Sequence, residues 1–475
     1  MADGAAYLEA HKVPDAITAA VTKVLKTRPA DPITAIGELL IKRQKSMVTV
    51  MVVGSGGREM AQSLKLAQSD VVDKVLVAPG NGGTSSCHPK ISNLADVKDS
   101  DIPGLVAAAK EHGVALVAIG PEGPLVAGIA DALAAENIPC FGPTKMAAEL
   151  ENSKAWMKEF FTRHGLPTAR HVTFTEFAAA KAHVESIDYP VVVKCSGLAG
   201  GKGVLMPTTK EETIDALKQV MVDKVFGSAG DQCVVEECLY GPECSVLAFC
   251  DGTTAVCMPG AQDHKRALDG DQGLNTGGMG AYARCPCLTK ELEEEAAAII
   301  QRTVTALASE GRKYVGVLFA GLMLTKDGPK LLEYNCRMGD PETQVVLPLL
   351  DSDLYLIMKA CTEGDLASTE IKWSSQSAAT VVMAAAGYPG TYAKGAPILG
   401  LEVAGAMEGV TVYHAGTKVA GGGIVCNGGR VLAVTGVGAN LKDAVGKAYA
   451  AVHAIKFDCK EGAMFRTDIA AKAFA

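Results

Sequence analysis

Hydrophobic and polar residues alternate along the stretch "KLLEYNCR", residues 330–337. Side chains of a strand point to opposite faces in turn, so this pattern predicts a strand with two different faces. The apolar face would carry Leu332, Tyr334 and Cys336. The polar face would carry Glu333, Asn335 and Arg337, whose carboxylate, amide oxygen and guanidinium suit a hard cation and phosphate oxygens. A surface strand with a solvated ion pair is the simpler alternative.

A different pattern begins at residue 46, where short β-branched runs that end in Gly or Pro turns alternate with helical stretches. The runs include "VTVMVVGSGGRE", "KVLVAPGN", "ALVAIGPEGP" and "IPCFGP", and they predict a small parallel sheet with helices on its faces. Ligands of such sheets bind beyond the carboxyl ends of the strands. We therefore expect residues 54–59, 79–83 and 120–122 around one crevice.

The first of these turns, "GSGGRE", has Glu59 where a dinucleotide fingerprint needs its third glycine. A backbone cradle for a small phosphorylated substrate fits better, because the following helix presents free amides to an anion. The alternative is that these glycines only permit tight turns.

A second glycine-rich stretch, "VVVKCSGLAGGKGV", is a strand carrying Lys194 that runs into a loop. A P-loop needs Ser or Thr after its lysine, but Gly203 follows Lys202. The loop instead predicts a flap whose backbone amides and Lys202 close over a polyphosphate. Its other members are Gly197, Gly200, Gly201 and Gly203.

The stretch "VVEECLYGPE" predicts a strand end followed by a Gly-Pro turn. The main-chain groups of such an extended hinge, Glu236, Glu237 and Leu239, can meet a purine edge, while Glu243 can take the ribose hydroxyls. The alternative is that these acids are turn residues.

Residues 1–46 form a separate helical region. Apolar residues recur at helical spacing in the first helix, at Ile17, Val21, Val24 and Leu25. Asp31 followed by Pro32 predicts the start of a second helix. Two short helices cannot bury such stripes alone, so they need a partner.

Composition limits the class of protein. The chain has 475 residues, 48% hydrophobic and 21% charged, with 51 glycines, which indicates an α/β enzyme of three or four domains. A formal charge of -8 argues against a nucleic-acid partner. The longest apolar runs are too short to span a membrane, and the first residues lack the features of a signal or transit peptide. We therefore expect a cytoplasmic enzyme.

The 14 cysteines lack paired C-x-x-C spacings. Cys285 and Cys287 flank a proline, which makes a poor tetrahedral zinc site. We interpret the cysteines as buried thiols in a reducing compartment.

In chain order, the elements described above resemble the ATP-grasp fold, in which two α+β subdomains hold ATP. Several motifs extend the resemblance to the glycinamide ribonucleotide synthetase (phosphoribosylamine-glycine ligase) family along residues 48–475. They are "APGNGGT", "GPEGPLVAGIAD", "QDHKRALDGDQGLNTGGMGAY", "FAGLML", "LLEYNCRMGDPETQ", "VVMAAAGYPG" and "VYHAGT". The resemblance implies an α/β and α+β multidomain fold with an N-terminal substrate domain (47–148), an ATP-grasp domain (149–375, flap subdomain about 166–238) and a C-terminal domain (376–475).

The family joins glycine to 5-phosphoribosylamine at the expense of ATP, through glycyl phosphate, in de novo purine synthesis. By similarity, Glu333 and Asn335 would hold Mg²⁺ or Mn²⁺ on the ATP phosphates. Arg337 would neutralise the transferring oxygens or the glycine carboxylate. Lys154 and Lys194 would contact the α- and β-phosphates, and the flap would exclude water.

The resemblance also implies substrate contacts. Asp263 would contact the amino group of glycine. Asp340 could hold the same group as an ammonium, although an acid before a proline is often only a turn residue. His264 would be either a general base or a structural histidine. The sugar phosphate would bind at Asn81, Gly82, Gly83, Thr84 and Glu122.

Two positions depart from the family. Met60 replaces a usual histidine, unless the helix points that residue inward. The strand "LFAGLML" lacks the acid that many ATP-grasp enzymes use for metal.

Residues 7–40 resemble the docking and dimerisation motif of the type II regulatory subunit of protein kinase A, although Ile33 and Ile36 stand where an aromatic residue is common. This resemblance implies a homodimer through residues 1–46 and binding of an amphipathic anchoring helix at a cytoskeletal or ciliary structure. The alternative is a hairpin packed on its own enzyme.

Two alternatives to the ligase remain open. One is another ATP-grasp carboxylate-amine ligase or a carboxylase. The other is a docking scaffold that retains an ATP-grasp body.

Overall fold

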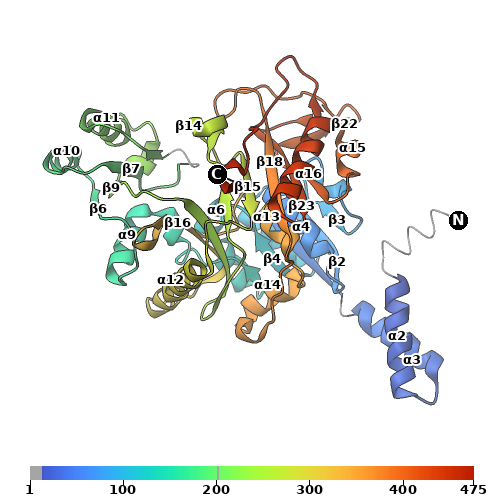
Figure 1. The fold of residues 1–475 in the computed structure, drawn as a ribbon. Coiled ribbons are helices and arrows are strands. Elements are labelled where there is room, and N and C mark those ends of the chain that lie inside the picture. The colour runs from blue at the N-terminus through green and yellow to red at the C-terminus, as the bar shows by residue number, and fades with distance from the viewer. Residues whose placement is uncertain (1–12, 46, 200–202, 475) are drawn as a thin grey trace.

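The computed structural model of the protein describes residues 13–45, 47–199 and 203–474. It contains a helical hairpin, a parallel sheet, a flap lobe and a large sheet that continues into the C-terminal part of the chain (Figure 1). The predicted mixed α/β fold class is confirmed. In these described ranges, no helix has the length and apolar character that crossing a bilayer requires.

The helical hairpin consists of α2 (Val13–Thr27) and α3 (Pro32–Lys45). Asp31 accepts a hydrogen bond from the backbone amide of Thr34 at 3.1 Å, as expected of a helix N-cap. Ala20 and Val24 are buried, whereas other apolar side chains are exposed, namely Ile17, Leu25 and Ile33. Figure 1 shows the hairpin standing apart from the rest of the chain.

The parallel sheet has the strand order β3-β2-β1-β4-β5. Its central strands are apolar on both faces because helices cover both sides, as is usual for parallel sheets. The strands are β1 (Val48–Gly54), β2 (Val72–Pro79), β3 (Ile91–Asn93), β4 (Val114–Ile119) and β5 (Cys140–Phe141). The helices are α4 (Gly57–Ala67), α5 (Ile102–Glu111), α6 (Glu122–Ala127) and α7 (Ile129–Ala135).

The flap lobe is an antiparallel sheet of order β6-β9-β7-β8 with two helices on one side. Figure 1 shows it projecting from the body on the side away from the hairpin. Its elements are β6 (His171–Phe174), α10 (Phe177–Ser186), β7 (Val191–Cys195), β8 (Val204–Leu205), α11 (Lys210–Met221) and β9 (Cys233–Glu237). Helices α8 (Glu149–Asn152) and α9 (Lys154–Arg163) precede it.

The large sheet runs in the order β17-β16-β10-β12-β15-β18-β23-β20. It passes without interruption from the predicted ATP-grasp region into the predicted C-terminal domain, because β15 pairs with β18. Its strands are β10 (Glu243–Asp251), β12 (Ala261–Asp263), β15 (Gly280–Ala283), β16 (Val315–Thr325), β17 (Gly328–Asn335), β18 (Ser377–Ala385), β20 (Val410–His414) and β23 (Arg430–Gly438). Strands β11 (Ala255–Cys257) and β25 (Ala463–Met464) pair at its side.

Short two-stranded sheets and helices complete the body. The paired strands are β13 (Arg266–Leu268) with β14 (Gln272–Asn275), β19 (Ile398–Leu399) with β24 (Lys456–Phe457), and β21 (Thr417–Ala420) with β22 (Gly423–Cys426). The helices are α12 (Lys290–Ser309), α13 (Thr343–Val346), α14 (Leu354–Glu363), α15 (Leu401–Gly405) and α16 (Leu441–Ala454).

One hydrophobic core joins the parallel sheet to the large sheet. Val50 and Val52 of β1 belong to the same buried cluster as Phe249 of β10 and Met338. The parallel sheet is therefore packed firmly against the body, and its carboxyl edge has a fixed position relative to β17.

Candidate functional site

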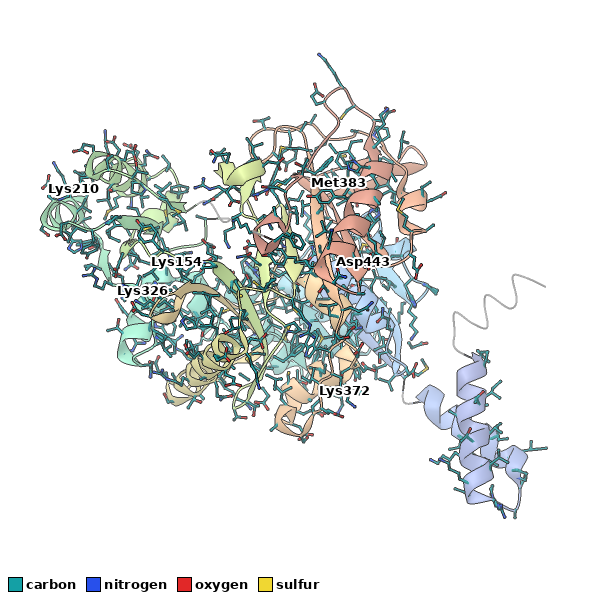
Figure 2. The ribbon with its side chains drawn as sticks, viewed as in Figure 1. Lys154, Lys210, Lys326, Lys372, Met383 and Asp443 are labelled. Atoms are coloured by element: carbon teal, nitrogen blue, oxygen red, sulfur yellow. The ribbon has the colours of Figure 1, made fainter. Side chains whose placement is uncertain are left out.

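A cavity of about 1000 Å³ lies between the flap lobe and the large sheet. Many predicted site residues line it, namely Lys154, Lys194, Gly203, Glu236, Glu237, Leu239, Glu243, Asp263, Glu333, Asn335, Arg337 and Asp340. Other predicted residues are outside its lining, namely Gly197, Asn81, Gly82, Gly83, Thr84 and Glu122. Figure 2 shows Lys210 far out on the flap lobe and Lys154 nearer the body.

Strand β17 carries the polar face that the sequence predicts, but its details differ. The strand ends at Asn335 rather than at Arg337. Gly321 pairs with Glu333 and Leu322 pairs with Leu331, so Leu332 is an extra residue in a β-bulge. The bulge turns Leu332 toward the cavity and puts Leu331 in the core instead. The prediction for Leu332 was wrong, whereas Tyr334 and Cys336 are buried as expected.

Positive charge surrounds Glu333. The Nζ atom of Lys154 lies 3.9 Å from Glu333 Oε2. Burial alone would raise the pKa of Glu333, but Lys154, Lys194 and Lys265 hold it below the ordinary value. Glu333 is therefore an ionised carboxylate on the cavity wall, among side chains that can also meet phosphate oxygens.

Lys154 owes its position to the start of α9. The side chain of Ser153 caps this helix by accepting from the amide of Trp156. The amide of Lys154 itself donates to the carbonyl of Ser196 at 2.8 Å. The second bond ties the helix start to the residue that directly follows β7, the strand that carries Lys194.

Glu236 is a buried ion-pair partner. Its Oε2 lies 3.0 Å from Lys194 Nζ and 2.9 Å from Lys158 Nζ, and the carboxylate is 2% exposed. Burial opposes ionisation of Glu236, but the two lysines lower its pKa. Burial lowers the pKa of Lys158 to about 8. The side chain of Glu236 thus fixes Lys194, and any hinge role falls to its backbone.

Lys158 was not among the predicted site residues. A usable signal was present, because Lys154 and Lys158 are four residues apart and so share one face of α9.

The hinge after β9 has both paired and open backbone groups. The amide of Glu237 donates to the carbonyl of Arg170, and that of Cys238 donates to the carbonyl of Pro190. Within the described residues, the amide of Leu239 has no backbone partner, and Leu239 lines the cavity. The hinge can therefore offer a main-chain donor to a planar ligand edge.

The glycine loop of the flap is described only at its ends. The amide of Gly197 donates to the carbonyl of Ala229 at 3.1 Å, and the amide of Cys195 donates to the carbonyl of Gly203 at 2.8 Å. These bonds fix where the loop leaves and rejoins the flap lobe. The predictions for Gly200, Gly201 and Lys202 fall outside the described residues.

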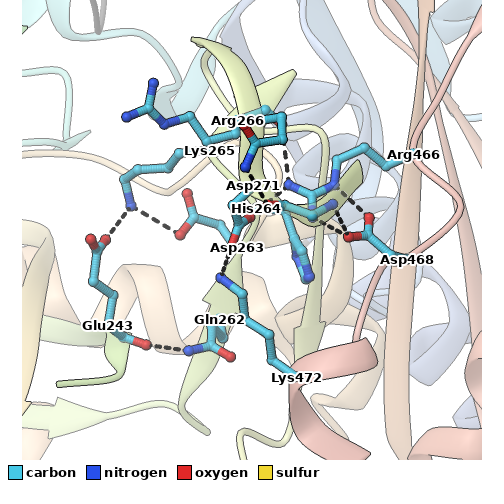
Figure 3. Close-up of polar contacts among 12 residues, drawn as sticks. Glu243, Gln262, Asp263, His264, Lys265, Arg266, Asp271, Arg466, Asp468 and Lys472 are labelled. Carbon is cyan, nitrogen blue, oxygen red and sulfur yellow. Dashed lines mark hydrogen bonds and ion pairs between the residues drawn. The ribbon is translucent and has the colours of Figure 1, made fainter. Parts of the chain in front are cut away.

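A lysine links two predicted ligand residues, as Figure 3 shows. Lys265 Nζ lies 3.2 Å from Glu243 Oε2 and 2.9 Å from Asp263 Oδ1. Gln262 donates Nε2 to the backbone carbonyl of Glu243 at 2.6 Å. Lys265 was not among the predicted site residues, and its bridge fixes the relative positions of the two acids.

The C-terminal strap, residues 466–472, holds the β13–β14 hairpin. Arg466 is 1% exposed, and its guanidinium lies 2.8 Å from Asp271 and 2.7 Å from Asp468 (Figure 3). His264 Nε2 accepts a hydrogen bond from the amide of Ala470 at 3.2 Å. Burial lowers the pKa of His264 to about 4. This neutral, packed imidazole favours the structural alternative over a general base.

Arg337 connects β17 to the parallel-sheet domain. Its guanidinium lies 3.4 Å from Glu122 and 3.1 Å from Glu151. It also donates to Asn335 Oδ1 at 3.1 Å. The predicted sugar-site acid Glu122 and the predicted metal ligand Asn335 are therefore bridged by one guanidinium.

Asp340 and Glu342 differ in their environment. Asp340 pairs with Arg430 at 3.3 Å and accepts from Gln344 at 2.9 Å. Its carboxylate is thus already balanced by a cation. Burial and then Asp263 raise the pKa of Glu342 to about 7.

The loop of residues 81–84 uses its polar groups within the protein. Asn81 Nδ2 donates to the carbonyls of Ser55 and His414, and Asn81 Oδ1 accepts from the amides of Gly83 and Thr84. A Cβ at Gly83 would overlap the His414 ring. This loop is therefore a joint between the parallel sheet and the C-terminal part.

Glu59, which stands where a dinucleotide fingerprint has its third glycine, has a structural role. Its carboxylate accepts from the amide of Gly56 at 2.6 Å and so caps α4. A Cβ at Gly120 would overlap the Glu59 side chain. Met60 is 3% exposed and packs with Tyr413, so the helix does point this residue inward.

A divalent cation fits the donor chemistry of Glu333 and Asn335, since carboxylate and amide oxygens are hard ligands. Within the described residues, no group of three or more His, Cys, Asp or Glu side chains is arranged to hold a metal ion. Two protein oxygens are enough for Mg²⁺ when phosphate oxygens and water complete the shell.

Three adjacent regions match the domains of one family. The phosphoribosylglycinamide synthetase N domain matches residues 48–151, its ATP-grasp (A) domain matches residues 152–343, and its C domain matches residues 378–472.

Individual relatives agree with these matches. The chain is 48% identical to a phosphoribosylamine–glycine ligase of Mesorhizobium japonicum, over 86% of this chain and 95% of that protein. It is 51% identical to the trifunctional purine biosynthetic protein adenosine-3 of Gallus gallus over 90% of this chain, but spans only 42% of that protein. The crystal structure of a phosphoribosylamine–glycine ligase from Thermotoga maritima superposes with a TM-score of 0.76 at 32% identity, covering 89% of this chain and 100% of that one.

Proposed function

Since the chain belongs to the phosphoribosylamine–glycine ligase family, we propose that it joins glycine to 5-phosphoribosylamine with consumption of ATP. The products would be glycinamide ribonucleotide, ADP and phosphate, in de novo purine synthesis. A carboxylate is a poor electrophile, so glycine would first become glycyl phosphate, and the amine would then displace phosphate. The observation that carries this proposal is the polar side of β17, which faces a cavity shared with Lys154 and Lys194.

Phosphoryl transfer asks the protein mainly for positioning and charge compensation. Lys154 and Lys194 would contact the α- and β-phosphates, and Glu236 would hold Lys194 in place through its 3.0 Å ion pair. Glu333 and Asn335 would hold Mg²⁺ or Mn²⁺, which supplies further neutralisation of the phosphate charge. The hinge at Glu237 and Leu239 would meet the purine edge.

The glycine substrate would lie between β17 and β12. Asp263 would contact its amino group, and Arg337 would meet its carboxylate or the oxygens in transfer. Asp340 would attract the glycine ammonium only weakly, because Arg430 already balances the charge of the Asp340 carboxylate. Glu243 would take the ribose hydroxyls, with Lys265 setting its distance from Asp263.

The flap would close over the phosphates through Gly197, Gly200, Gly201, Lys202 and Gly203. Closure would exclude water, which would otherwise hydrolyse the acyl phosphate.

The sugar phosphate would bind beside the loop of residues 81–84, near Gly82, Gly83, Thr84 and Glu122. Asn81 would act mainly by holding that loop, because its amide group is engaged by Ser55 and His414.

An ADP-release assay tests the proposed reaction. ADP release should require both glycine and 5-phosphoribosylamine. Release that needs bicarbonate and ignores glycine would instead identify a carboxylase, and the proposal would be lost.

We also propose that residues 1–46 join two copies of the chain and bind an amphipathic anchoring helix, placing the enzyme at a cytoskeletal or ciliary structure of the cytoplasm. The exposed apolar side chains of Ile17, Leu25 and Ile33 support this, because isolated helices expose such side chains at a cost in free energy. Burial against a second hairpin would offset that cost.

Light scattering tests the dimer. Deletion of residues 1–46 should halve the particle mass and abolish binding of an amphipathic helical peptide, with turnover nearly intact. Leu25→Glu should do the same, whereas the neighbouring Thr22→Glu, at an exposed polar position, should not. An unchanged mass and unchanged peptide binding after the deletion would exclude the docking role.

A further inference from the structure

Three cysteine side chains meet at one wall of the cavity. Cys244 belongs to β10, and Cys285 and Cys287 belong to the turn before α12. The Sγ atoms of Cys285 and Cys287 are 3.0 Å apart. Cys244 and Cys287 line the cavity, and Cys287 is partly exposed whereas the other two are buried. The proposed ligation uses none of these thiols.

A metal centre does not account for this thiol cluster. In the part of the chain that the structure describes, His, Cys, Asp and Glu side chains form no group of three that could hold a metal ion. Pro286 also restricts the turn between the two closest thiols. The proximity of the sulfurs therefore points to chemistry between thiols rather than to chelation.

The cluster favours a reactive thiolate at its exposed member. The neighbouring Cys244 and Cys285 thiols lower the pKa of Cys287 well below its ordinary value. The thiolate, not the thiol, attacks sulfur electrophiles. Cys287 thus combines exposure to the cavity, stabilised negative charge and a second thiol within contact.

We propose that Cys287 and Cys285 form a thiol–disulfide exchange site that takes low-molecular-weight disulfides. The Cys287 thiolate attacks one sulfur of the small disulfide, forms a mixed disulfide and expels one thiolate. Cys285 then attacks the Cys287 sulfur, forms the Cys285–Cys287 disulfide, and releases the second small thiol, which takes the Cys285 proton. The protein loses two electrons, and the small disulfide gains them.

Because Cys287 lines the cavity, the redox state of the Cys285–Cys287 pair should affect ligand binding in the cavity. Cys287 lines the cavity in which the proposed nucleotide would bind, so a group carried on its sulfur would take up part of that cavity, and Cys244 lies next to Glu243 at the start of β10. Modification should therefore compete with ATP. Ring closure between Cys285 and Cys287 needs their sulfurs to approach by about 1 Å to reach a disulfide bond of about 2.05 Å.

Mass spectrometry of the full chain with glutathione disulfide as the probe tests this site. The reduced protein should first gain one glutathionyl group at Cys287 and then release it as glutathione when the internal disulfide forms, which leaves the chain two hydrogen atoms lighter than the reduced protein. Cys285→Ser should trap the mixed disulfide on Cys287. Cys287→Ser should slow modification by about tenfold, since the stabilised thiolate is lost. ATP should protect the wild-type protein.

Cys459 provides the matched control, because it is an exposed cysteine outside the cavity. Cys459→Ser should leave the modification of Cys287 and its protection by ATP unchanged. Labelling that maps first to Cys459, or a Cys287→Ser protein that reacts as fast as wild type, would overturn the proposal. Protection by ATP rests on the proposed function, whereas the order of labelling and the trapped mixed disulfide do not, so a failure of one proposal can be told from a failure of the other.

Discussion

The polar side of β17 and the loop of residues 81–84 were both predicted as ligand sites, but their polar atoms are used differently. Glu333 and Asn335 face a cavity of about 1000 Å³. The side chain of Asn81, in contrast, makes four hydrogen bonds to protein groups. Polar residues at a strand end can therefore serve either a ligand or a joint between domains. The number of protein partners distinguishes the two.

Glu333→Gln should have the largest effect, on turnover. The neutral amide removes the charge that would hold a cation among Lys154, Lys194 and Lys265, so turnover should fall by about 10²-fold. Steady-state assays at saturating Mg²⁺, with thermal denaturation in parallel, would check this. Glu363→Gln, at an exposed ion pair on α14, is the control and should change neither quantity. Wild-type turnover in Glu333→Gln would remove this residue from the site.

The contact between the loop of residues 81–84 and His414 should make the free energy of unfolding depend on pH. Burial lowers the pKa of His414 to about 4 from an ordinary 6.5, so the unfolded chain binds this proton more readily than the folded one. The contribution of His414 to the free energy of unfolding is fully present above pH 6.5 and is lost as the pH falls through 4. The loss should amount to about 3 kcal/mol.

Denaturant unfolding between pH 4 and 7 measures how the free energy of unfolding changes with pH. The slope should be smaller in His414→Gln than in wild type. Equal slopes in wild type and His414→Gln would mean that the joint does not exclude the proton.

Asn81→Ala separates the two roles of the loop. Loss of its hydrogen bonds should lower the free energy of unfolding by about 2 kcal/mol, and urea titration would measure this. Ser85→Ala, at an exposed position directly after this loop, should be neutral. If Asn81→Ala raised the KM for 5-phosphoribosylamine without any loss of stability, Asn81 would be a ligand rather than a joint residue.

Met60→Leu should have the smallest effect. Met60 packs with Tyr413 and Val382, and its sulfur accepts a hydrogen bond from the amide of His414. Leucine has a similar volume but cannot accept that bond, so the replacement should cost about 1 kcal/mol and leave KM unchanged. Calorimetry and steady-state kinetics would measure both. A tenfold or larger change in KM would show that residue 60 contacts substrate.

Much of the fold was predictable because local patterns determine it. The parallel sheet followed from its apolar runs and turns, and the Asp31 cap followed from a residue type at a helix start. The bulge at Leu332 was not predictable, because an extra residue in a strand is defined only by the partner strand, here β16.

The candidate site was predictable only in part. Glu333 and Asn335 lie on the cavity wall because alternation along one strand fixed their side. Lys158 and Lys265 were not predicted: the spacing of Lys154 and Lys158 shows only a shared helix face, and the partners Glu236 and Glu243 lie far away in the sequence. Burial changed the interpretation of Glu236, whose carboxylate the sequence presented simply as part of a strand end.

The β15–β18 pairing has a practical consequence for anyone who divides this chain. A fragment that ends before β18 would leave the main-chain donors and acceptors of β15 unpaired along an open edge, which is a template for aggregation. A separately expressed C-terminal fragment would expose the complementary edge of β18. Truncation at this point should therefore yield insoluble material rather than two independent modules.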